Sequence, residues 1–305
     1  MKRFPQNARV CFLGDSITHG NNFVTRIIAY YQKHFPEDHV KFWNCGVSGG
    51  SAGSGLLYLE DDLLRHNPTH VAIMLGVNDS CRTELDKPDS PEKTAVLDGA
   101  LSGYTEKMNR LCDILREHSI EVILCTPAPY AEFYETGDHP LPGGHALILR
   151  YAETVRKLAH ERNLDVVDYH ARLSELYLDE ALFNPDHVHP NDKGHYRMAE
   201  CFLRAQGLWA DEYQPIDAVI RDAGLDEWHT LVGKLRDLYA GEWMIVCNYS
   251  LSFEEKMKAA KEYIEQEKWG DFLYFKNLSK TYYENKPKEA EIAARIDAIT
   301  EANFR

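Results

Sequence analysis

The stretch Ala8-Arg9-Val10-Cys11-Phe12-Leu13-Gly14-Asp15-Ser16 indicates the class of fold. Residues 8–13 form a short apolar run that predicts a buried strand, and Gly14 ends it. Similar runs predict further strands at 40–43, 69–75, 120–125 and 166–168. Helical spacing predicts helices at 23–35, 56–65, 95–117, 145–162 and, after Pro190, 191–205. Strands and helices that alternate in this way predict an α/β fold, with a parallel sheet covered by helices on both faces.

Residues 207–305 have a different character. They are rich in Lys, Glu and Tyr, and their pattern is mainly helical, without internal repeats. Their aromatic residues include Trp209, Trp228, Trp243, Tyr249, Tyr263, Trp269, Tyr274, Tyr282 and Tyr283. We expect a boundary between Gly207 and Pro215, which gives a domain of residues 1–207 and a helical C-terminal extension of residues 208–305. Packing of the extension on the sheet domain is the simplest interpretation, and a dimerisation element or a lid are the alternatives.

The chain is acidic, which bears on its partners. Its formal net charge is −14, so long-range attraction to nucleic acid or to an anionic membrane is not expected. No run approaches the roughly 20 apolar residues of a membrane span, and none of signal-peptide length follows the N-terminus. The seven cysteines lack CxxC spacing. Four lie in apolar surroundings, as small buried side chains do: Cys11, Cys45, Cys112 and Cys125. We therefore expect a reduced, cytoplasmic protein without stable membrane insertion.

A second stretch, Asp186-His187-Val188-His189-Pro190, predicts the chemistry. Asp186 and His189 are three residues apart, so their side chains share a face if the segment forms a helical turn. The carboxylate can then accept the Nδ1–H of the imidazole, which leaves Nε2 free to take a proton. Ser16 follows the first predicted strand, so we expect its hydroxyl to be exposed at the strand end. A serine hydroxyl and an oriented imidazole are what nucleophilic acyl transfer requires, so Ser16, His189 and Asp186 are candidate catalytic residues of a serine hydrolase.

Two small-residue loops after predicted strands are candidate binding sites for a developing negative oxygen. Gly49 lies in Gly46-Val47-Ser48-Gly49-Gly50-Ser51, and Asn78 lies in Gly76-Val77-Asn78-Asp79. Because the carboxyl ends of parallel strands meet at one sheet edge, both loops can converge with Ser16. The Ser16 and Gly49 backbone N–H groups and the Asn78 side chain would then form an oxyanion hole. Taken singly, each loop is also compatible with an ordinary turn, and Asp15 with a turn or supporting residue.

The histidine-rich segment has a rival interpretation as a metal site. Its ligand-type side chains are Asp186, His187, His189, Asp192 and His195. Against this, His189 and His195 are six residues apart, which is poor same-face spacing on a helix, and the cysteines lack thiolate-ligand spacing. We therefore expect no metal and no cofactor. Other histidines are expected at the surface or in a pocket wall, among them His19, His139 and His145.

Together these segments resemble the GDSL lipase/esterase group, also called the SGNH hydrolase superfamily. That family is named for Ser, Gly, Asn and His in four blocks, which occur here in the same order as Ser16, Gly49, Asn78 and His189. The blocks read Gly14-Asp15-Ser16-Ile17-Thr18, Asn44-Cys45-Gly46-Val47-Ser48-Gly49, Gly76-Val77-Asn78-Asp79 and Asp186-His187-Val188-His189-Pro190. The family acid lies three residues before its histidine, which corresponds to Asp186. Ile17 replaces the Leu of the family motif, and the resemblance ends near residue 205.

The resemblance implies a three-layer α/β/α sandwich and a serine esterase that forms a covalent acyl-enzyme through Ser16, His189 and Asp186, without a cofactor. Family substrates include short-chain acyl esters, acetylated sugars, lysophospholipids and thioesters. The acidic surface and the absence of a long apolar lid favour a small-molecule ester, short-chain or O-acetyl, with acetylated carbohydrate as one candidate. Tyr130, Phe133 and Tyr134 follow a strand and are candidates for a substrate-contacting wall or for ordinary loop packing.

Other functions remain compatible with the sequence. One is a non-catalytic binding module on a hydrolase-like fold whose triad is unused. Another is an assembly protein whose C-terminal helices form a homo-oligomer. Within the hydrolases, lysophospholipase or thioesterase activity is the alternative to short-chain esterase activity.

Overall fold

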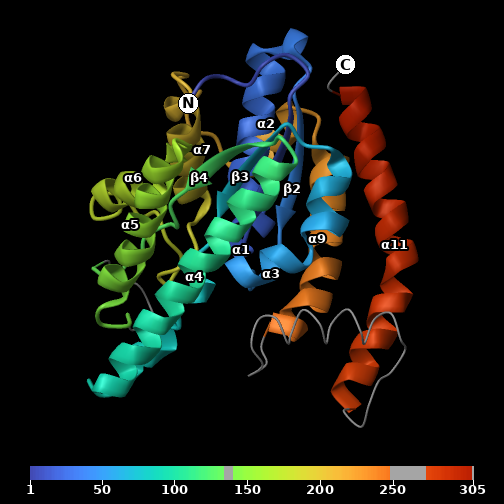
Figure 1. Ribbon diagram of the computed structural model, residues 1–305. Coiled ribbons are helices and arrows are strands. Elements are labelled where there is room, and N and C mark those ends of the chain that lie inside the picture. The colour runs from blue at the N-terminus through green and yellow to red at the C-terminus, as the bar shows by residue number, and fades with distance from the viewer. Residues whose placement is uncertain (134–139, 248–272, 304–305) are drawn as a thin grey trace.

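The structure, a computed structural model, describes residues 1–133, 140–247 and 273–303, and its centre is a five-stranded parallel sheet (Figure 1). The strands are β1 (Arg9–Gly14), β2 (Lys41–Gly46), β3 (His70–Met74), β4 (Glu121–Cys125) and β5 (Asp165–Val167). Their order in the sheet is β2-β1-β3-β4-β5. In register, Leu13 of β1 lies between Cys45 of β2 and Ile73 of β3. All five predicted strands are confirmed.

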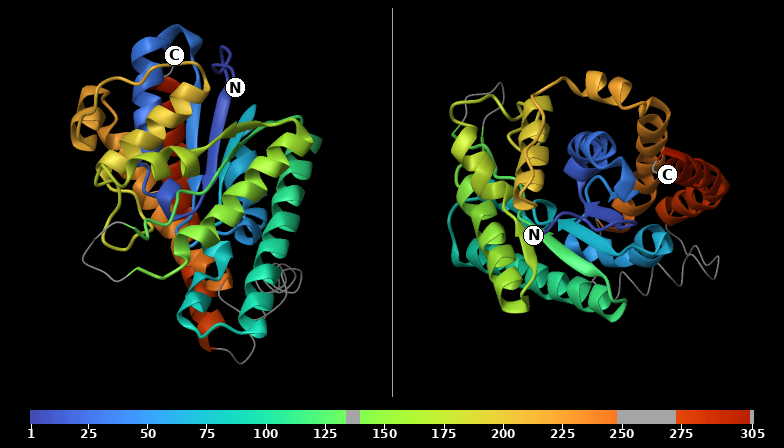
Figure 2. Two further views of the ribbon diagram at one scale, coloured as in Figure 1. Left: turned by 90° about the vertical axis from the view of Figure 1, so that its left-hand side faces the viewer. Right: turned by 90° about the horizontal axis from the view of Figure 1, so that it is seen from above.

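Helices cover both faces of the sheet, which gives the predicted three-layer α/β/α sandwich (Figure 2). One face carries α2 (Asn22–His34) and α7 (Asp192–Ala205), with α6 (Tyr169–Leu176) packed beside α7. The other face carries α3 (Ala52–Leu57), α4 (Pro91–Glu117) and α5 (Gly144–Arg162). Since both faces are covered, each strand is mainly apolar after its polar first residue.

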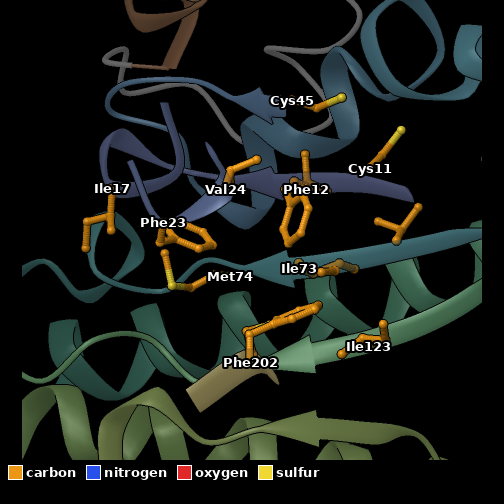
Figure 3. Close-up of a cluster of buried hydrophobic side chains, with 14 of the residues drawn as sticks. Cys11, Phe12, Ile17, Phe23, Val24, Cys45, Ile73, Met74, Ile123 and Phe202 are labelled. Atoms are coloured by element: carbon orange, nitrogen blue, oxygen red, sulfur yellow. The ribbon is translucent and has the colours of Figure 1, made fainter. Parts of the chain in front are cut away.

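Aromatic side chains fill the space between the sheet and the α2–α7 layer (Figure 3). The ring centroid of Phe12 lies 6.0 Å from that of Phe23 in α2 and 5.5 Å from that of Phe202 in α7. Cys11 points in the opposite direction from its neighbour Phe12, as alternate side chains of a strand do. The predicted buried cysteines are confirmed as free and buried: Cys11, Cys45, Cys112 and Cys125.

Two short segments differ from the prediction. The expected helix at 56–65 is divided into the end of α3, a π-helical turn η2 (Leu59–Leu63) and a 3-10 turn η3 (Leu64–His66). Its start lies earlier because Ser51 forms a capping box with Ser54, a local signal that apolar spacing does not register. Helix α6 was not expected, and Asp168 caps it by accepting the Ala171 N–H at 3.1 Å. Further short helices are α1 (Ser16–His19), η1 (Pro36–Asp38), η4 (Asn78–Ser80) and η5 (Arg82–Asp86).

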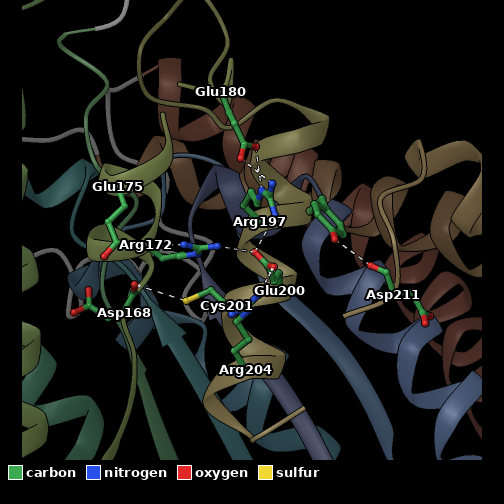
Figure 4. A network of polar contacts seen from close by, with 10 residues as sticks. Asp168, Arg172, Glu175, Glu180, Arg197, Glu200, Cys201, Arg204 and Asp211 are labelled. Carbon is green, nitrogen blue, oxygen red and sulfur yellow. Dashed lines mark hydrogen bonds and ion pairs between the residues drawn. The ribbon is translucent and has the colours of Figure 1, made fainter. Parts of the chain in front are cut away.

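A buried carboxylate network fixes α6 against α7 (Figure 4). Glu200 of α7 is only 6% exposed and lies between three arginines: Arg172 at 3.3 Å, Arg197 at 3.2 Å and Arg204 at 3.0 Å. Burial alone would raise the pKa of Glu200, but the three guanidinium groups hold it below its usual value. The network therefore secures α7, the helix that directly follows the Asp186–Pro190 segment.

The C-terminal extension is mainly helical where the structure describes it, and it packs on the sheet domain. Its helices are α8 (Ile216–Asp222), α9 (Asp226–Cys247) and α11 (Leu273–Asn303). From α7 the chain passes around α2 to α8 and α9 (Figure 2). Helices α9 and α11 lie side by side along β2, which is an edge strand of the sheet. The side chains of Trp243, Tyr249, Tyr263, Trp269, Tyr274, Tyr282 and Tyr283 lie outside the described part of the structure.

Direct contacts join the extension to this edge strand. Trp43 of β2 donates its Nε1–H to Asp297 of α11 at 3.0 Å. Trp228 of α9 is fully buried and donates its Nε1–H to Thr300 of α11 at 3.3 Å. The packing interpretation of the extension is therefore the one that the structure adopts. Across residues 1–133, 140–247 and 273–303, no helix has both the length and the apolar character needed to cross a bilayer.

Candidate active site

Ser16 lies where β1 ends and α1 begins. Asp15 caps the short helix, and its Oδ1 accepts the Ile17 N–H at 3.0 Å. Gly14 permits the sharp change of direction, because a Cβ there would lie 2.1 Å from Thr18 Oγ1 and 3.0 Å from Met74 O. The predicted position of Ser16, at the carboxyl end of the first strand and the start of a helix, is confirmed.

Residues 186–189 form a turn and not the helical turn that the spacing suggested. Asp186 Oδ1 accepts the N–H groups of Val188 at 3.0 Å and of His189 at 2.9 Å, a side-chain turn typical of Asp. His187 adopts a left-handed conformation with φ 62°, which bends the chain back on itself. Asp186 and His189 meet as predicted, but the turn brings them together rather than a shared helix face.

Three side chains form a hydrogen-bonded line. Ser16 Oγ lies 2.8 Å from His189 Nε2, and His189 Nδ1 lies 2.5 Å from Asp186 Oδ2. Because Nδ1–H faces a carboxylate, the Nε2 lone pair faces the serine hydroxyl. Burial tends to raise the pKa of Asp186, but hydrogen bonds from the His189 amide and imidazole hold it below its usual value. An ionised carboxylate, an imidazole and a hydroxyl in this order can activate the hydroxyl as a nucleophile.

The site is open to solvent. The side chains of His189 and Asp186 are 39% and 46% exposed. A substrate can therefore approach Ser16 without displacing any part of the chain that the structure describes.

The loops that carry Gly49 and Asn78 contact each other. Asn78 Nδ2 donates one hydrogen to Gly50 O at 2.9 Å, and its second hydrogen has no acceptor among the described residues. Gly49 has φ 77°, a left-handed conformation that favours glycine. Gly50 must also be small, because a Cβ there would lie 2.7 Å from Val47 O.

Two backbone amides near this point lack partners. Within the described ranges, neither the Ser16 N–H nor the Gly49 N–H donates a hydrogen bond to another residue. Backbone N–H groups are normally paired, so two free donors at these positions are an exception. Together with the free hydrogen of Asn78, they are the kind of donors that stabilise an oxyanion.

Two acids support these loops, the buried Asp15 and the half-buried Asp79, and only Asp15 drew attention in the sequence. Asp79 accepts the Ala52 N–H through both oxygens, at 3.0 and 3.2 Å, and so joins two loops. Burial raises the pKa of Asp15 to about 6 and that of Asp79 to about 7, and the nearby Asp15 charge adds to the effect on Asp79. No sequence pattern distinguishes Asp79 from an ordinary loop residue after a strand.

The rival metal cluster does not assemble around His189. Asp192 accepts from Arg26 at 2.6 Å, and His187 Nδ1 bonds to the Ala131 carbonyl at 2.9 Å. His195 is buried and its ring stacks on Phe23. These side chains point to separate partners and do not form one shared ligand set.

Another group of potential ligands does come together, at Cys45, Asp62 and His66. The Asp62 carboxylate, however, binds both terminal nitrogens of Arg236, and both side chains are almost fully buried. Burial and nearby arginines lower the pKa of His66 to about 2, whereas burial raises the pKa of the Cys45 thiol. The Arg236 guanidinium thus occupies the place beside Asp62 that a metal cation would need, and this group of side chains does not fit a metal ion.

The candidate substrate-wall residues and the other histidines differ in where the structure places them. Tyr130 is 5% exposed and its hydroxyl accepts the Leu141 N–H at 2.9 Å, so it takes the packing role rather than that of a substrate wall. Phe133 is 63% exposed. Tyr134 and His139 lie outside the described residues. His19, expected at the surface or in a pocket wall, has a side chain that is 16% exposed and bonds to the Ser48 N–H and to Asp237.

Comparisons with known proteins show which family and fold this chain is similar to. Residues 12–197 match the sequence model of the GDSL-like lipase/acylhydrolase family. An acetylxylan esterase of Geobacillus stearothermophilus is 29% identical over 217 residues, which are 66% of this chain and 94% of that protein. The crystal structure of Axe2, an acetylxylan esterase from the same organism, superposes with a TM-score of 0.57 at 27% identity and covers 70% of this chain and 100% of its own.

A second solved structure is similar over the whole chain. It is described as BT4096, a gut microbial diltiazem-metabolizing enzyme, and superposes with a TM-score of 0.75 at 16% identity. The likeness covers 100% of this chain and 96% of that chain. At this identity the likeness concerns the fold alone, and it includes the C-terminal helices.

Proposed function

Since this chain belongs to the GDSL-like lipase/acylhydrolase family and is a carboxylic ester hydrolase, we propose that Ser16, His189 and Asp186 are its catalytic triad. The observation that carries this proposal is the hydrogen-bonded line from Ser16 Oγ through His189 to Asp186, with contacts of 2.8 and 2.5 Å. The free amides of Ser16 and Gly49 and the side chain of Asn78 serve as the oxyanion hole.

The reaction then follows in two halves. Ser16 Oγ attacks the ester carbonyl carbon while its proton passes to His189 Nε2, and the carbonyl oxygen becomes an oxyanion. His189 returns this proton to the leaving alcohol as the C–O bond breaks, which leaves an acyl group on Ser16. Water attacks the acyl-enzyme in the same way, with His189 as the base, and releases the carboxylic acid. Asp186 orients the imidazole and stabilises the imidazolium in both halves.

We propose a short-chain or O-acetyl ester as the substrate, with acetylated carbohydrate as the first candidate. The support is the similarity to an acetylxylan esterase over nearly all of that protein's length. The open site and the absence of a bilayer-spanning helix in the described residues are compatible with a small-molecule ester.

The test is hydrolysis of p-nitrophenyl acetate, butyrate and octanoate by the wild type, Ser16→Ala and a matched Ser102→Ala control. Ser102 lies exposed on α4, far along the chain from the site. We expect turnover that is fastest on acetate and falls with chain length. Ser16→Ala should lower kcat by about 10³-fold or more, while Ser102→Ala should leave it unchanged.

Other outcomes separate the alternatives. Unchanged turnover in Ser16→Ala would remove Ser16 as the nucleophile. Faster turnover on octanoate than on acetate would contradict a short-chain substrate and favour lysophospholipid or thioester chemistry. If no ester is turned over, a fluorophosphonate probe separates two explanations. Labelling of Ser16, detected in its tryptic peptide, would show that Ser16 is a reactive nucleophile and that the esters tested are not substrates. No labelling would indicate an unused triad. Acetate release from acetylated xylo-oligosaccharides then tests the carbohydrate.

A further inference from the structure

The loop of residues 47–50 carries the proposed oxyanion donor, and its backbone N–H groups are held at each position except that donor. Val47 N–H donates to Gly14 O at 3.0 Å, and Gly50 N–H donates to Val47 O at 2.8 Å. Ser48 N–H is held by a side chain, His19 Nδ1, at 3.3 Å. The direction of the Gly49 N–H is therefore set by its neighbours Ser48 and Gly50, and His19 holds Ser48.

His19 can hold this amide in only one tautomer. Because Nδ1 accepts the Ser48 N–H, the ring proton must be on Nε2, which donates to Asp237 Oδ1 at 3.1 Å. Burial lowers the pKa of His19 below its usual value, although the hydrogen bond with Asp237 opposes this shift. The neutral Nε2–H form is thus the form that both partners select.

His19 also joins the loop to the nucleophile. It is the last residue of α1, the four-residue helix that begins with Ser16. The backbone of this helix touches the end of β2, where a Cβ on Gly46 would lie 2.4 Å from the His19 amide nitrogen. One imidazole therefore connects the helix that carries Ser16 with the loop that carries Gly49.

Asp237 is itself exposed, but the helix that carries it is firmly anchored. Its neighbour Arg236 is buried against Asp62, and His229 Nδ1 lies 2.9 Å from Thr25 Oγ1 of α2. These contacts hold the α9 backbone at Asp237 in place, so the Asp237 carboxylate is positioned next to His19. A hydrogen bond from a neutral imidazole to an exposed carboxylate contributes little to stability, so its effect should be on geometry rather than on folding.

We propose that His19 and Asp237 are positioning residues for the oxyanion hole: Asp237, from the C-terminal extension, selects the Nε2–H tautomer of His19, whose Nδ1 then aims the loop that presents the Gly49 N–H. This inference rests on the proposed function. It gives the C-terminal extension a part in the reaction, because the extension supplies a residue that organises the site.

Substitutions that keep one half of the imidazole test this arrangement. In His19→Asn the side-chain oxygen replaces Nδ1 and still accepts the Ser48 N–H, so kcat on p-nitrophenyl acetate should stay within about 3-fold of wild type. His19→Ala and His19→Gln remove that acceptor. Each should lower kcat by about 10–100-fold with KM nearly unchanged, less than the loss of a whole oxyanion donor.

Asp237→Ala should lower kcat about 2- to 5-fold, because part of the population adopts the wrong tautomer. It should have no further effect in a His19→Asn background, where no tautomer exists. Glu212→Ala, which removes an exposed acid elsewhere in the extension, is the control and should leave kcat unchanged. Thermal melts should agree with wild type within a few degrees for all of these variants.

Several results would overturn the proposal. His19→Asn as slow as His19→Ala, or His19→Ala as fast as wild type, would show that the acceptor does not matter. A readout independent of turnover is the ¹⁵N spectrum of the His19 ring, where a proton on Nδ1 would contradict the assignment. Ser16→Ala, assayed alongside, separates failure of the proposed function from failure of the positioning role of His19. If Ser16→Ala retains turnover, the proposed function fails. The ¹⁵N spectrum still shows whether His19 Nδ1 can accept the Ser48 N–H.

Discussion

Removal of the buried guanidinium of Arg236 should destabilise the protein more than any exposed ion-pair substitution in the extension. Arg236 of α9 and Asp62 of η2 are 1% and 2% exposed, and both terminal nitrogens of the guanidinium contact the carboxylate, one of them at 2.7 Å. Burial alone would lower the pKa of Arg236, but the Asp62 charge raises it above its usual value. Arg236→Met would leave the Asp62 carboxylate buried without its partner.

The expected cost follows from the burial. Breaking a buried ion pair by removing one partner costs about 3–5 kcal/mol, because the remaining charge is uncompensated. That is a large fraction of the roughly 5–15 kcal/mol that stabilises a typical domain. With a urea m-value of about 3 kcal/mol/M, the unfolding midpoint should fall by about 1–1.7 M. Replacing both charges, in Asp62→Val with Arg236→Met, should recover most of this loss.

The measurement is urea unfolding at pH 7, followed by far-UV circular dichroism. Arg295→Met is the matched control, since Arg295 also makes a two-point contact with a carboxylate, from Nε and one terminal nitrogen to Glu227 at 2.7 and 2.9 Å, but both side chains are 56% exposed. It should cost less than about 1 kcal/mol. Equal costs for the two arginine variants, or a double variant less stable than Arg236→Met alone, would refute the reasoning from burial.

Four further predictions concern the site and the domains. Asn78→Ala should lower kcat about 10²–10³-fold on p-nitrophenyl acetate, and a loss below tenfold would exclude Asn78 from the oxyanion hole. Ser16→Ala and His189→Ala should not be additive in kcat, and a multiplicative loss in the double variant would show that they act independently. The raised pKa of Asp79, about 7, means that the folded state keeps a proton that the unfolded state releases near pH 4. Stability should therefore decrease between about pH 4 and 7, and urea midpoints of Asp79→Asn should decrease less over that range than those of wild type. We propose a domain boundary after residue 207, where truncation should uncover the β2 edge and lower the melting temperature by several degrees; an equally stable fragment 1–207 would contradict this packing.

Much of the fold was predictable because the relevant signals are local. Each strand is a short apolar run, and a parallel sheet requires such runs to be separated by helices. The carboxyl ends of the strands must then share one edge, which places Ser16, Gly49 and Asn78 near one another without any knowledge of side-chain contacts. Errors occurred where apolar spacing is a poor guide, as in the segment 56–65, where capping and a π-helical turn decide the backbone.

The sequence by itself determined the alternation of strands and helices, the loops that meet at the strand ends, and the pairing of Asp186 with His189 at a separation of three residues. Only the tertiary structure decided how that pair meets, through a side-chain turn with His187 in a left-handed conformation. It also decided the partners of polar residues far apart in the chain, such as Asp62 with Arg236, 174 residues away, and His19 with Asp237, 218 residues away. The physical reason is that apolar periodicity reports which face of an element is buried, whereas a charged or polar side chain carries no record of its partner until the elements pack.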